Sequence, residues 1–270
     1  MKNQNYISIQ TGILLFLITN LLSFSNLLAE DNLDLFLTEK ANITQQDIQE
    51  NKILTASLTE FSQTQQDKLA SKSEKKAHYL LFKAIQKRFL KNYQNYQSLR
   101  STIQEGSFDC LTGTAVYALI LQNLKYDFEI WEMQHHIFLM INLEGGEQIL
   151  IESTDPVHGF VLGQKNINRR IALYQEETRS KEDFYSSRQN FEGEISLKNL
   201  AGLQHYNLAV VDFNSQKFDS SINKLEKSLA LYQSKRAKEL LMLTIAYLPS
   251  QKQNELWTKY DFANFAIATK

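Results

Sequence analysis

The spacing of apolar residues along the chain predicts helices first and then a small sheet. Between residues 75 and 99, apolar and aromatic residues recur every three or four positions, which indicates helix. These positions are Tyr79, Leu80, Phe82, Ile85, Phe89, Leu90 and Tyr93. Residues 110–124 (CLTGTAVYALILQNL) predict an apolar helix, which Ser107 and Asp109 can cap. Apolar runs at 126–133, 136–143 and 148–154 predict three strands, with a hairpin turn at Gly145-Gly146.

The pattern changes twice in the second half of the chain. Residues 166–190 are charged and lack strong periodicity, so we expect a surface segment with one short helix at most. From Leu197 onward the spacing is helical, with a turn at 214–217 and a third helix at 237–248. Small and aromatic residues stand where a tetratricopeptide helix pair needs them: Ala209, Phe218, Ser221 and Ser228. An ordinary helical hairpin would have the same pattern.

These segments predict an α+β protein in five parts. They are a signal peptide (1–29), an N-terminal helical region (30–105), a core with a cysteine-bearing helix on an antiparallel sheet (106–165), a surface linker (166–196) and a tetratricopeptide-like helical region (197–270). Only two prolines and nine glycines occur in 270 residues. This scarcity favours long helices and disfavours an all-β sandwich.

The N-terminus and the overall charge limit the location and the partners. Lys2, the apolar stretch 12–22 and Ala29 as a cleavage residue are typical of an export signal. We therefore expect an exported protein of a bacterial envelope, periplasmic or secreted, and an uncleaved membrane anchor is the alternative. With 29 basic and 30 acidic residues, no positive surplus is present to neutralise phosphates, so nucleic acid is not an expected partner.

Cys110 is the only cysteine, so no intramolecular disulfide can form. A single thiol in an exported protein is either buried and inert or kept for chemistry. Cys110 stands at the first turn of the predicted helix, where the partial positive charge of the helix N-terminus favours a thiolate. This position favours the reactive interpretation.

A cysteine nucleophile requires an imidazole beside it as proton acceptor. Of the five histidines, His136 opens the predicted strand HIFLMI, where alternation places it on one face with Phe138 and Met140. His78 and His205 fall in amphipathic helices, and we expect them at the surface or its boundary. His136 is therefore the candidate base.

The imidazole in turn requires an acceptor that fixes its tautomer. The returning strand brings both Glu152 and Asp155 towards His136. Simple antiparallel pairing places residue 155 about opposite residue 136, with Glu152 close by along the strand. Geometry inferred from the sequence does not separate the two carboxylates.

In this order, the residues resemble the core of the transglutaminase-like superfamily, a branch of the papain-like folds. The resemblance spans Gly106–Phe160 and rests on Cys110-Leu-Thr-Gly, His136-Ile-Phe138 and Ile151-Glu152-Ser153-Thr154. In the family's motif an aromatic residue stands two positions after the histidine, and Phe138 therefore selects His136 over His135. The family's acid falls by motif on Glu152, where aspartate is usual, and Asp155 is the fallback.

The resemblance implies acyl transfer through a thioester on Cys110. The protein would be a cysteine peptidase or a transglutaminase-type acyltransferase that acts on peptide or glutamine-type amides of a peptide or protein substrate. The backbone N–H of Cys110 and the side chain of Gln104 would form the oxyanion hole, although Gln104 is more simply an exposed loop residue. No motif requires a metal or another cofactor. The alternative is a catalytically inactive module that binds a peptide, or a protein partner at the C-terminal helices.

Overall fold

The computed structural model describes residues 32–37, 44–133, 136–180 and 193–260 of the chain. The predicted signal peptide lies outside these residues. In the part of the chain that the structure describes, no helix is long and apolar enough to cross a membrane.

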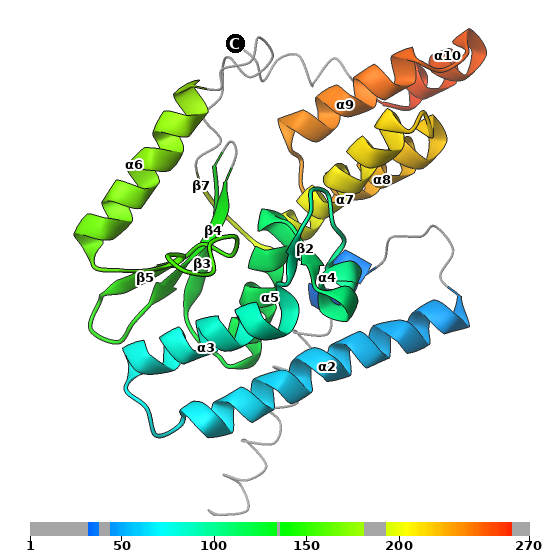
Figure 1. Cartoon of the computed structure of the whole chain (residues 1–270). Helices are drawn as coiled ribbons and strands as arrows, with labels where there is room; N and C mark the ends of the chain where they lie inside the picture. The colour runs from blue at the N-terminus through cyan, green and yellow to red at the C-terminus, as the bar shows by residue number, and fades with distance from the viewer. Residues whose placement is uncertain (1–31, 38–43, 134–135, 181–192, 261–270) are drawn as a thin grey trace, which may run out of the picture.

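The fold belongs to the α+β class, as predicted, and is built around a five-stranded antiparallel sheet (Figure 1). The strand order is β6-β5-β4-β3-β7. The strands are β3 (Phe128–Glu132), β4 (Ile137–Asn142), β5 (Gln148–Ile151), β6 (Phe160–Leu162) and β7 (Gly193–Ile195). The three predicted strands are thus β3, β4 and β5, each shorter than expected, and His136 immediately precedes β4 rather than opening it.

The register of the β4–β5 hairpin differs by one residue from the simple antiparallel pairing that the sequence predicts. Leu139 lies opposite Ile151 and Met140 opposite Leu150, across a turn in which Gly145 and Gly146 have φ of +98° and +83°. Continued to the end of the hairpin, this register places residue 154, not residue 155, opposite His136. Because a one-residue slip moves a side chain to the other face of a sheet, the register favours Glu152 over Asp155 for the face of His136.

Helix α5 (Cys110–Asn123) fills the centre of the molecule, and every residue from Leu111 to Leu121 is buried. It packs on one face of the sheet, with Ile137, Leu139 and Ile141 of β4 in the same apolar cluster. The predicted cap is confirmed for Asp109, whose carboxylate accepts from the backbone N–H of Thr112 at 2.8 Å.

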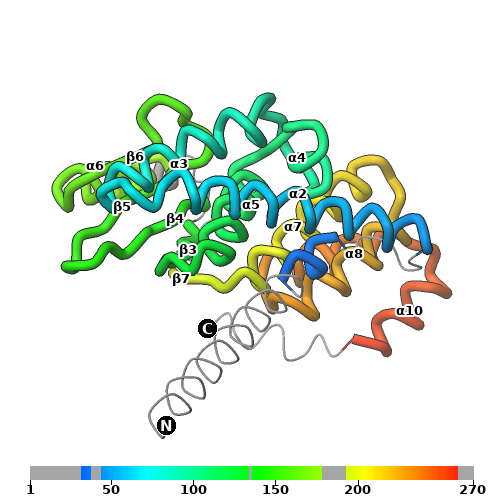
Figure 2. The backbone as a smooth tube through the Cα atoms, turned by 90° about the horizontal axis from the view of Figure 1, so that it is seen from below, coloured from blue at the N-terminus to red at the C-terminus, as the bar shows by residue number. Residues whose placement is uncertain are grey.

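N-terminal helices cover the other sides of α5 (Figures 1 and 2). They are α2 (Gln45–Leu69), α3 (Glu74–Phe89) and α4 (Leu99–Glu105). The helix predicted as far as residue 99 ends at Phe89, because the chain then enters β1 (Asn92–Tyr93), which pairs in parallel with β2 (Ser107–Phe108). This pairing moves Tyr93 out of the helical register and towards the start of α5.

The prediction of surface positions for His78 and His205 is wrong. Their exposed fractions are 2% and 1%. The His78 ring packs against Tyr126 at 4.4 Å between centroids, and His205 Nε2 lies 3.0 Å from the carbonyl oxygen of Leu35. Burial lowers the pKa of both imidazoles. Neither helix alone shows in its sequence that residues distant along the chain cover these faces.

Residues predicted to hold one short helix at most form α6 (Gln164–Ser180), a helix of 17 residues. Ile167 and Tyr174 are buried, and they pack with Phe138 and Met140 on the face of the sheet opposite α5. With Ile171 partly buried beside them, the apolar positions follow a spacing of i, i+4 and i+7. This short stripe, hidden among charged residues, is the signal that the sequence analysis missed.

The C-terminal region is helical, as predicted, and contains α7 (Leu197–Asn214), α8 (Phe218–Leu231), α9 (Lys235–Ala246) and α10 (Ser250–Lys259). Helix α7 belongs to two apolar clusters. Leu200 and Leu203 join the cluster around α5, whereas Ala209 joins a separate cluster with α8 and α9. One continuous helix therefore fixes the C-terminal helices to the core.

Helices α7 and α8 approach closely at Gly202, and this contact generates a prediction for stability. A Cβ at Gly202 would lie 2.7 Å from Cβ of Tyr232 and 3.1 Å from the carbonyl oxygen of Ser228. Overpacking costs about 1–3 kcal/mol, and the gain of about 1 kcal/mol in helix propensity on replacing glycine by alanine offsets part of that cost. Gly202→Ala should therefore lower the free energy of unfolding by about 1 kcal/mol, the middle of the remaining range, in denaturant titrations.

The matched control is Gly193→Ala, because no atom of the described residues lies within 4 Å of the added Cβ. Its free energy of unfolding should stay within about 0.5 kcal/mol of the wild type. Equal stability of the two variants would show that α7 and α8 are not packed this closely.

Candidate functional site

A cavity of about 390 Å³ lies at the N-terminal end of α5 and is lined by both Cys110 and His136. The other walls come from the β1–α4 connection, from the end of β3 and from the C-terminal helices. Besides Cys110, His136 and Asp109, the polar and aromatic lining residues are Tyr93, Asn95, Tyr96, Tyr206, Asn207 and Arg236. The structure thus brings the predicted nucleophile and the predicted base to one cavity.

Cys110 is half-buried. Hydrogen bonds made by Asp109 and Ser153 fix the backbone at this start of the helix. Asp109 caps the helix, and its Oδ2 also accepts from the backbone N–H of Gln97 at 3.1 Å. The hydroxyl of Ser153 donates to the carbonyl oxygen of Cys110 at 3.3 Å. The segment after β5, which carries the predicted acid, is therefore bonded directly to the residue that carries the thiol.

The electrostatic environment opposes a thiolate at Cys110. Burial, followed by the charges of Asp109 and Glu152, raises the pKa of the Cys110 thiol to about 12, against the opposing effect of the backbone N–H groups of Leu111 and Cys110. The helix N-terminus acts as the sequence predicts, but desolvation and two carboxylates outweigh it. The resting thiol is protonated.

His136 faces helix α6 through two contacts. Its ring stacks on Tyr174 with 4.0 Å between centroids, and its Nε2 lies 3.2 Å from Oε2 of Glu177. Within the described part of the chain, no hydrogen bond joins the imidazole to the Cys110 thiol, to Glu152 or to Asp155. Tyr174 and Glu177 are site residues that the sequence analysis missed, since it placed them in a linker.

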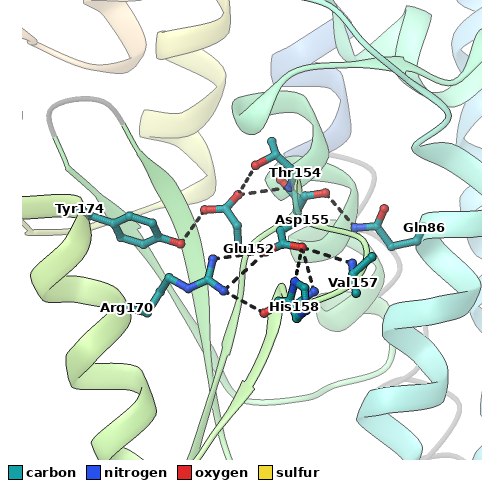
Figure 3. A network of polar contacts seen from close by, with 9 residues as sticks. Gln86, Glu152, Thr154, Asp155, Val157, His158, Arg170 and Tyr174 are labelled. Carbon is teal, nitrogen blue, oxygen red and sulfur yellow. Dashed lines mark hydrogen bonds and ion pairs between the residues drawn. The ribbon is translucent and has the colours of Figure 1, made fainter. Parts of the chain in front are cut away.

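Glu152 is buried and is bonded to neighbours other than His136 (Figure 3). Its Oε2 accepts from the hydroxyl of Tyr174 at 2.8 Å, and its Oε1 accepts from the hydroxyl of Thr154 at 2.8 Å. Burial and the Glu152 charge raise the pKa of Tyr174, so its phenol remains a donor. Glu152 therefore reaches His136 only through the tyrosine ring, while its charge acts on the thiol.

Asp155 belongs to a tight loop after β5 (Figure 3). Its Oδ1 accepts from the backbone N–H groups of His158 at 2.7 Å and Val157 at 3.2 Å, and its Oδ2 lies 3.4 Å from the Arg170 guanidinium. Burial would raise the pKa of Asp155, but these N–H groups and Arg170 together hold it below its ordinary value. Its observed partners are those of a loop-shaping residue.

Gln104 lies exposed on α4 and is not among the residues that line the cavity. Arg236, in contrast, was not foreseen and lines the cavity from α9. It forms an ion pair with the buried carboxylate of Glu132 at the end of β3, which also accepts from the hydroxyl of Tyr232 at 2.8 Å. This cluster fixes the C-terminal helices against the sheet beside the cavity.

Comparisons with protein-family models, with curated proteins and with solved structures found no match to this chain. Among the described residues, no cluster of three or more His, Cys, Asp or Glu side chains could hold a metal ion.

The raised thiol pKa generates a prediction for reactivity. Raising the pKa of the Cys110 thiol from its ordinary value of 9.0 to about 12 reduces the thiolate fraction near neutral pH roughly a thousandfold. The higher intrinsic nucleophilicity of a more basic thiolate recovers part of this loss, so iodoacetamide should label Cys110 roughly 50-fold more slowly than free cysteine. The rate should rise about tenfold per pH unit between pH 7 and 9.

Glu152→Gln removes one of the two charges that raise this pKa and should accelerate labelling at neutral pH. Glu194→Gln, which changes an exposed glutamate on β7, is the matched control and should not. The rate of labelling is measured by intact-mass spectrometry. A rate equal to that of free cysteine, or a rate that levels off below pH 9, would contradict a raised pKa of the Cys110 thiol.

Proposed function

We propose that the cavity is a thiol-dependent acyl-transfer site, in which Cys110 is the nucleophile and His136 the general base and acid. The observation that supports this most directly is that both side chains line one cavity at the capped N-terminus of a buried helix. The proposed class is a transglutaminase-like cysteine peptidase or acyltransferase that acts on peptide or glutamine-type amides. The order of Cys110, His136 and Glu152 along the chain supports that class.

In the proposed reaction, the sulfur of Cys110 attacks an amide carbonyl carbon while His136 takes the thiol proton. The C–S bond forms, the carbonyl oxygen gains negative charge, and the backbone N–H of Cys110 stabilises this charge in the proposed mechanism. The C–N bond then breaks, and the amine leaves with the proton from His136. Water or a second amine attacks the thioester and gives its proton through His136 to the departing sulfur, which restores the thiol.

A protonated resting thiol is compatible with this sequence of steps. A nucleophile of high pKa can be activated by a neighbouring base during the attack rather than before it. The imidazole and the sulfur must then come closer than they are in the free cavity, and catalytic hydrogen bonds that are long in the free enzyme commonly tighten when substrate binds. The free cavity corresponds to a resting state of the proposed site.

A second candidate function is a catalytically inactive module that binds a peptide in this cavity or a protein partner at the C-terminal helices. The observation that favours it is the combination of a thiol pKa of about 12 with an imidazole bonded to Glu177. For either function, we propose an exported protein, periplasmic or secreted, on the basis of the N-terminal sequence.

The two candidates differ in whether an acyl group is ever attached to Cys110. With p-nitrophenyl acetate as a small acyl donor, the proposed enzyme should form an acetyl thioester on Cys110 that hydroxylamine cleaves. Intact-mass spectrometry of acid-quenched samples would detect this adduct. Cys110→Ala should abolish it, and His136→Gln should slow its formation roughly 10²–10⁴-fold.

His158→Gln is the matched control, because the side chain of His158 is 78% exposed and lies outside the cavity lining. Its rate should equal that of the wild type. If wild type and Cys110→Ala both stay free of adduct, the binding module is the better account. An adduct that persists in Cys110→Ala rules out Cys110 as the nucleophile.

A further inference from the structure

We infer that Glu177, on α6, is the carboxylate that orients His136, with Tyr174 as the wall against which the imidazole ring lies. This inference rests on the proposed function in one respect, namely that His136 is the base of the site. The sequence predicts Glu152 or Asp155, which follow β5, for the orienting role. The structure points to Glu177 on α6 instead.

The two nitrogens of His136 have different surroundings. Nε2 lies 3.2 Å from Oε2 of Glu177. Nδ1 makes no hydrogen bond with any residue that the structure describes. A carboxylate that accepts from Nε2–H leaves Nδ1 unprotonated in the neutral ring, and an unprotonated nitrogen is what a general base must present to a thiol. Glu177 therefore favours the tautomer that the proposed reaction requires.

The two carboxylates predicted from the sequence are engaged elsewhere. Both oxygens of Glu152 have partners, Tyr174 on one side and Thr154 on the other. Asp155 is bonded within its own loop and to Arg170. For either of them to orient the imidazole, hydrogen bonds that hold a buried carboxylate or shape the loop would have to break, and a buried polar group left unpaired is destabilising.

The helix itself explains why Glu177 and Tyr174 act on the same ring. Residues three apart lie on the same face of a helix, so both side chains are directed to the end of β4. Tyr174 is fixed by burial and by its hydrogen bond to Glu152. Glu177 stands in the last turn of α6, where the negative end of the helix dipole disfavours a free carboxylate and favours pairing with a donor.

Other titratable groups also lie near the imidazole. Cys110, Asp109 and Arg236 line the same cavity, and Glu152 lies beyond Tyr174, whose hydroxyl it binds. Of the four carboxylates Asp109, Glu152, Asp155 and Glu177, only Glu177 is within hydrogen-bond distance of the ring. Glu177 is thus a positioning residue, and Glu152 supports it indirectly through the tyrosine.

The test uses the full chain labelled with ¹⁵N, with the ring signals of His136 assigned by their loss in His136→Gln. At a pH where the ring is neutral, the wild type should show protonation at Nε2 and a downfield Nε2–H proton, as expected for a donor to a carboxylate. Glu177→Ala should lose this downfield signal. Glu176→Ala, on the same helix and without a hydrogen bond or ion pair to the described residues, should keep it.

Kinetics with p-nitrophenyl acetate provide the second measurement. Glu177→Ala should lower the rate of thioester formation roughly 10–100-fold, a part of the 10²–10⁴-fold contribution of a positioned base. KM should change little, because Glu177 is not among the residues that line the cavity. Glu152→Gln should keep the Nε2–H signal, since an amide oxygen can still accept from Tyr174.

The outcomes separate this inference from the proposed function. If no thioester forms but Glu177→Ala alone loses the Nε2–H signal, Glu177 positions His136 and the enzymatic proposal fails. If thioester forms and Glu177→Ala matches the wild type in both signal and rate, the inference is overturned and the enzymatic proposal stands. Loss of the signal in Glu152→Gln but not in Glu177→Ala would also overturn it.

Discussion

The burial of α5 on every side is the constraint on which the rest of the structure depends. A helix that is apolar all round has no solvent face, so other elements must cover it completely. The sheet covers one side, the N-terminal helices cover the others, and the first half of α7 completes the shell. The N-terminal end carries the carboxylate of Asp109 and the thiol of Cys110, and the cavity opens there. The position of the cavity is thus a consequence of how α5 is packed.

The same packing decides the state of the thiol. A helix N-terminus stabilises a nearby negative charge by about 0.3–1 kcal/mol, whereas a rise of three pKa units corresponds to about 4 kcal/mol against the thiolate. Cys110 is placed where the helix dipole helps it, but the burial that makes α5 the centre of the fold, together with Asp109 and Glu152, has the larger effect. An acyl-transfer site of this kind depends on proton removal during the attack, and therefore on the orientation of His136.

The sequence was sufficient for features set by local pattern and insufficient for those set by contacts between distant segments. The helix at Cys110, its Asp109 cap, the Gly145-Gly146 turn and the two faces of β4 follow from apolar spacing and turn chemistry, and all are present. The burial of His78 and His205 depends on other segments that cover them. Helix α6 was missed because three apolar positions, Ile167, Ile171 and Tyr174, are few among charged residues. The sequence placed Cys110 and His136 together but could not identify the partner of the imidazole.

The C-terminal helices are part of the cavity rather than an appendage to it. Leu203 of α7 packs in the central cluster and also lines the cavity, while Tyr206, one turn further on, lines it and packs against the separate C-terminal cluster. Arg236 of α9 is held at the cavity by the buried carboxylate of Glu132, whose other partner, Tyr232, follows α8. A buried carboxylate left without its cation is costly, so this ion pair resists separation of the C-terminal helices from the sheet. A ligand that enters the cavity therefore meets walls from the core and from the C-terminal helices, and its fit depends on α7 and α9 as well as on the core that carries Cys110.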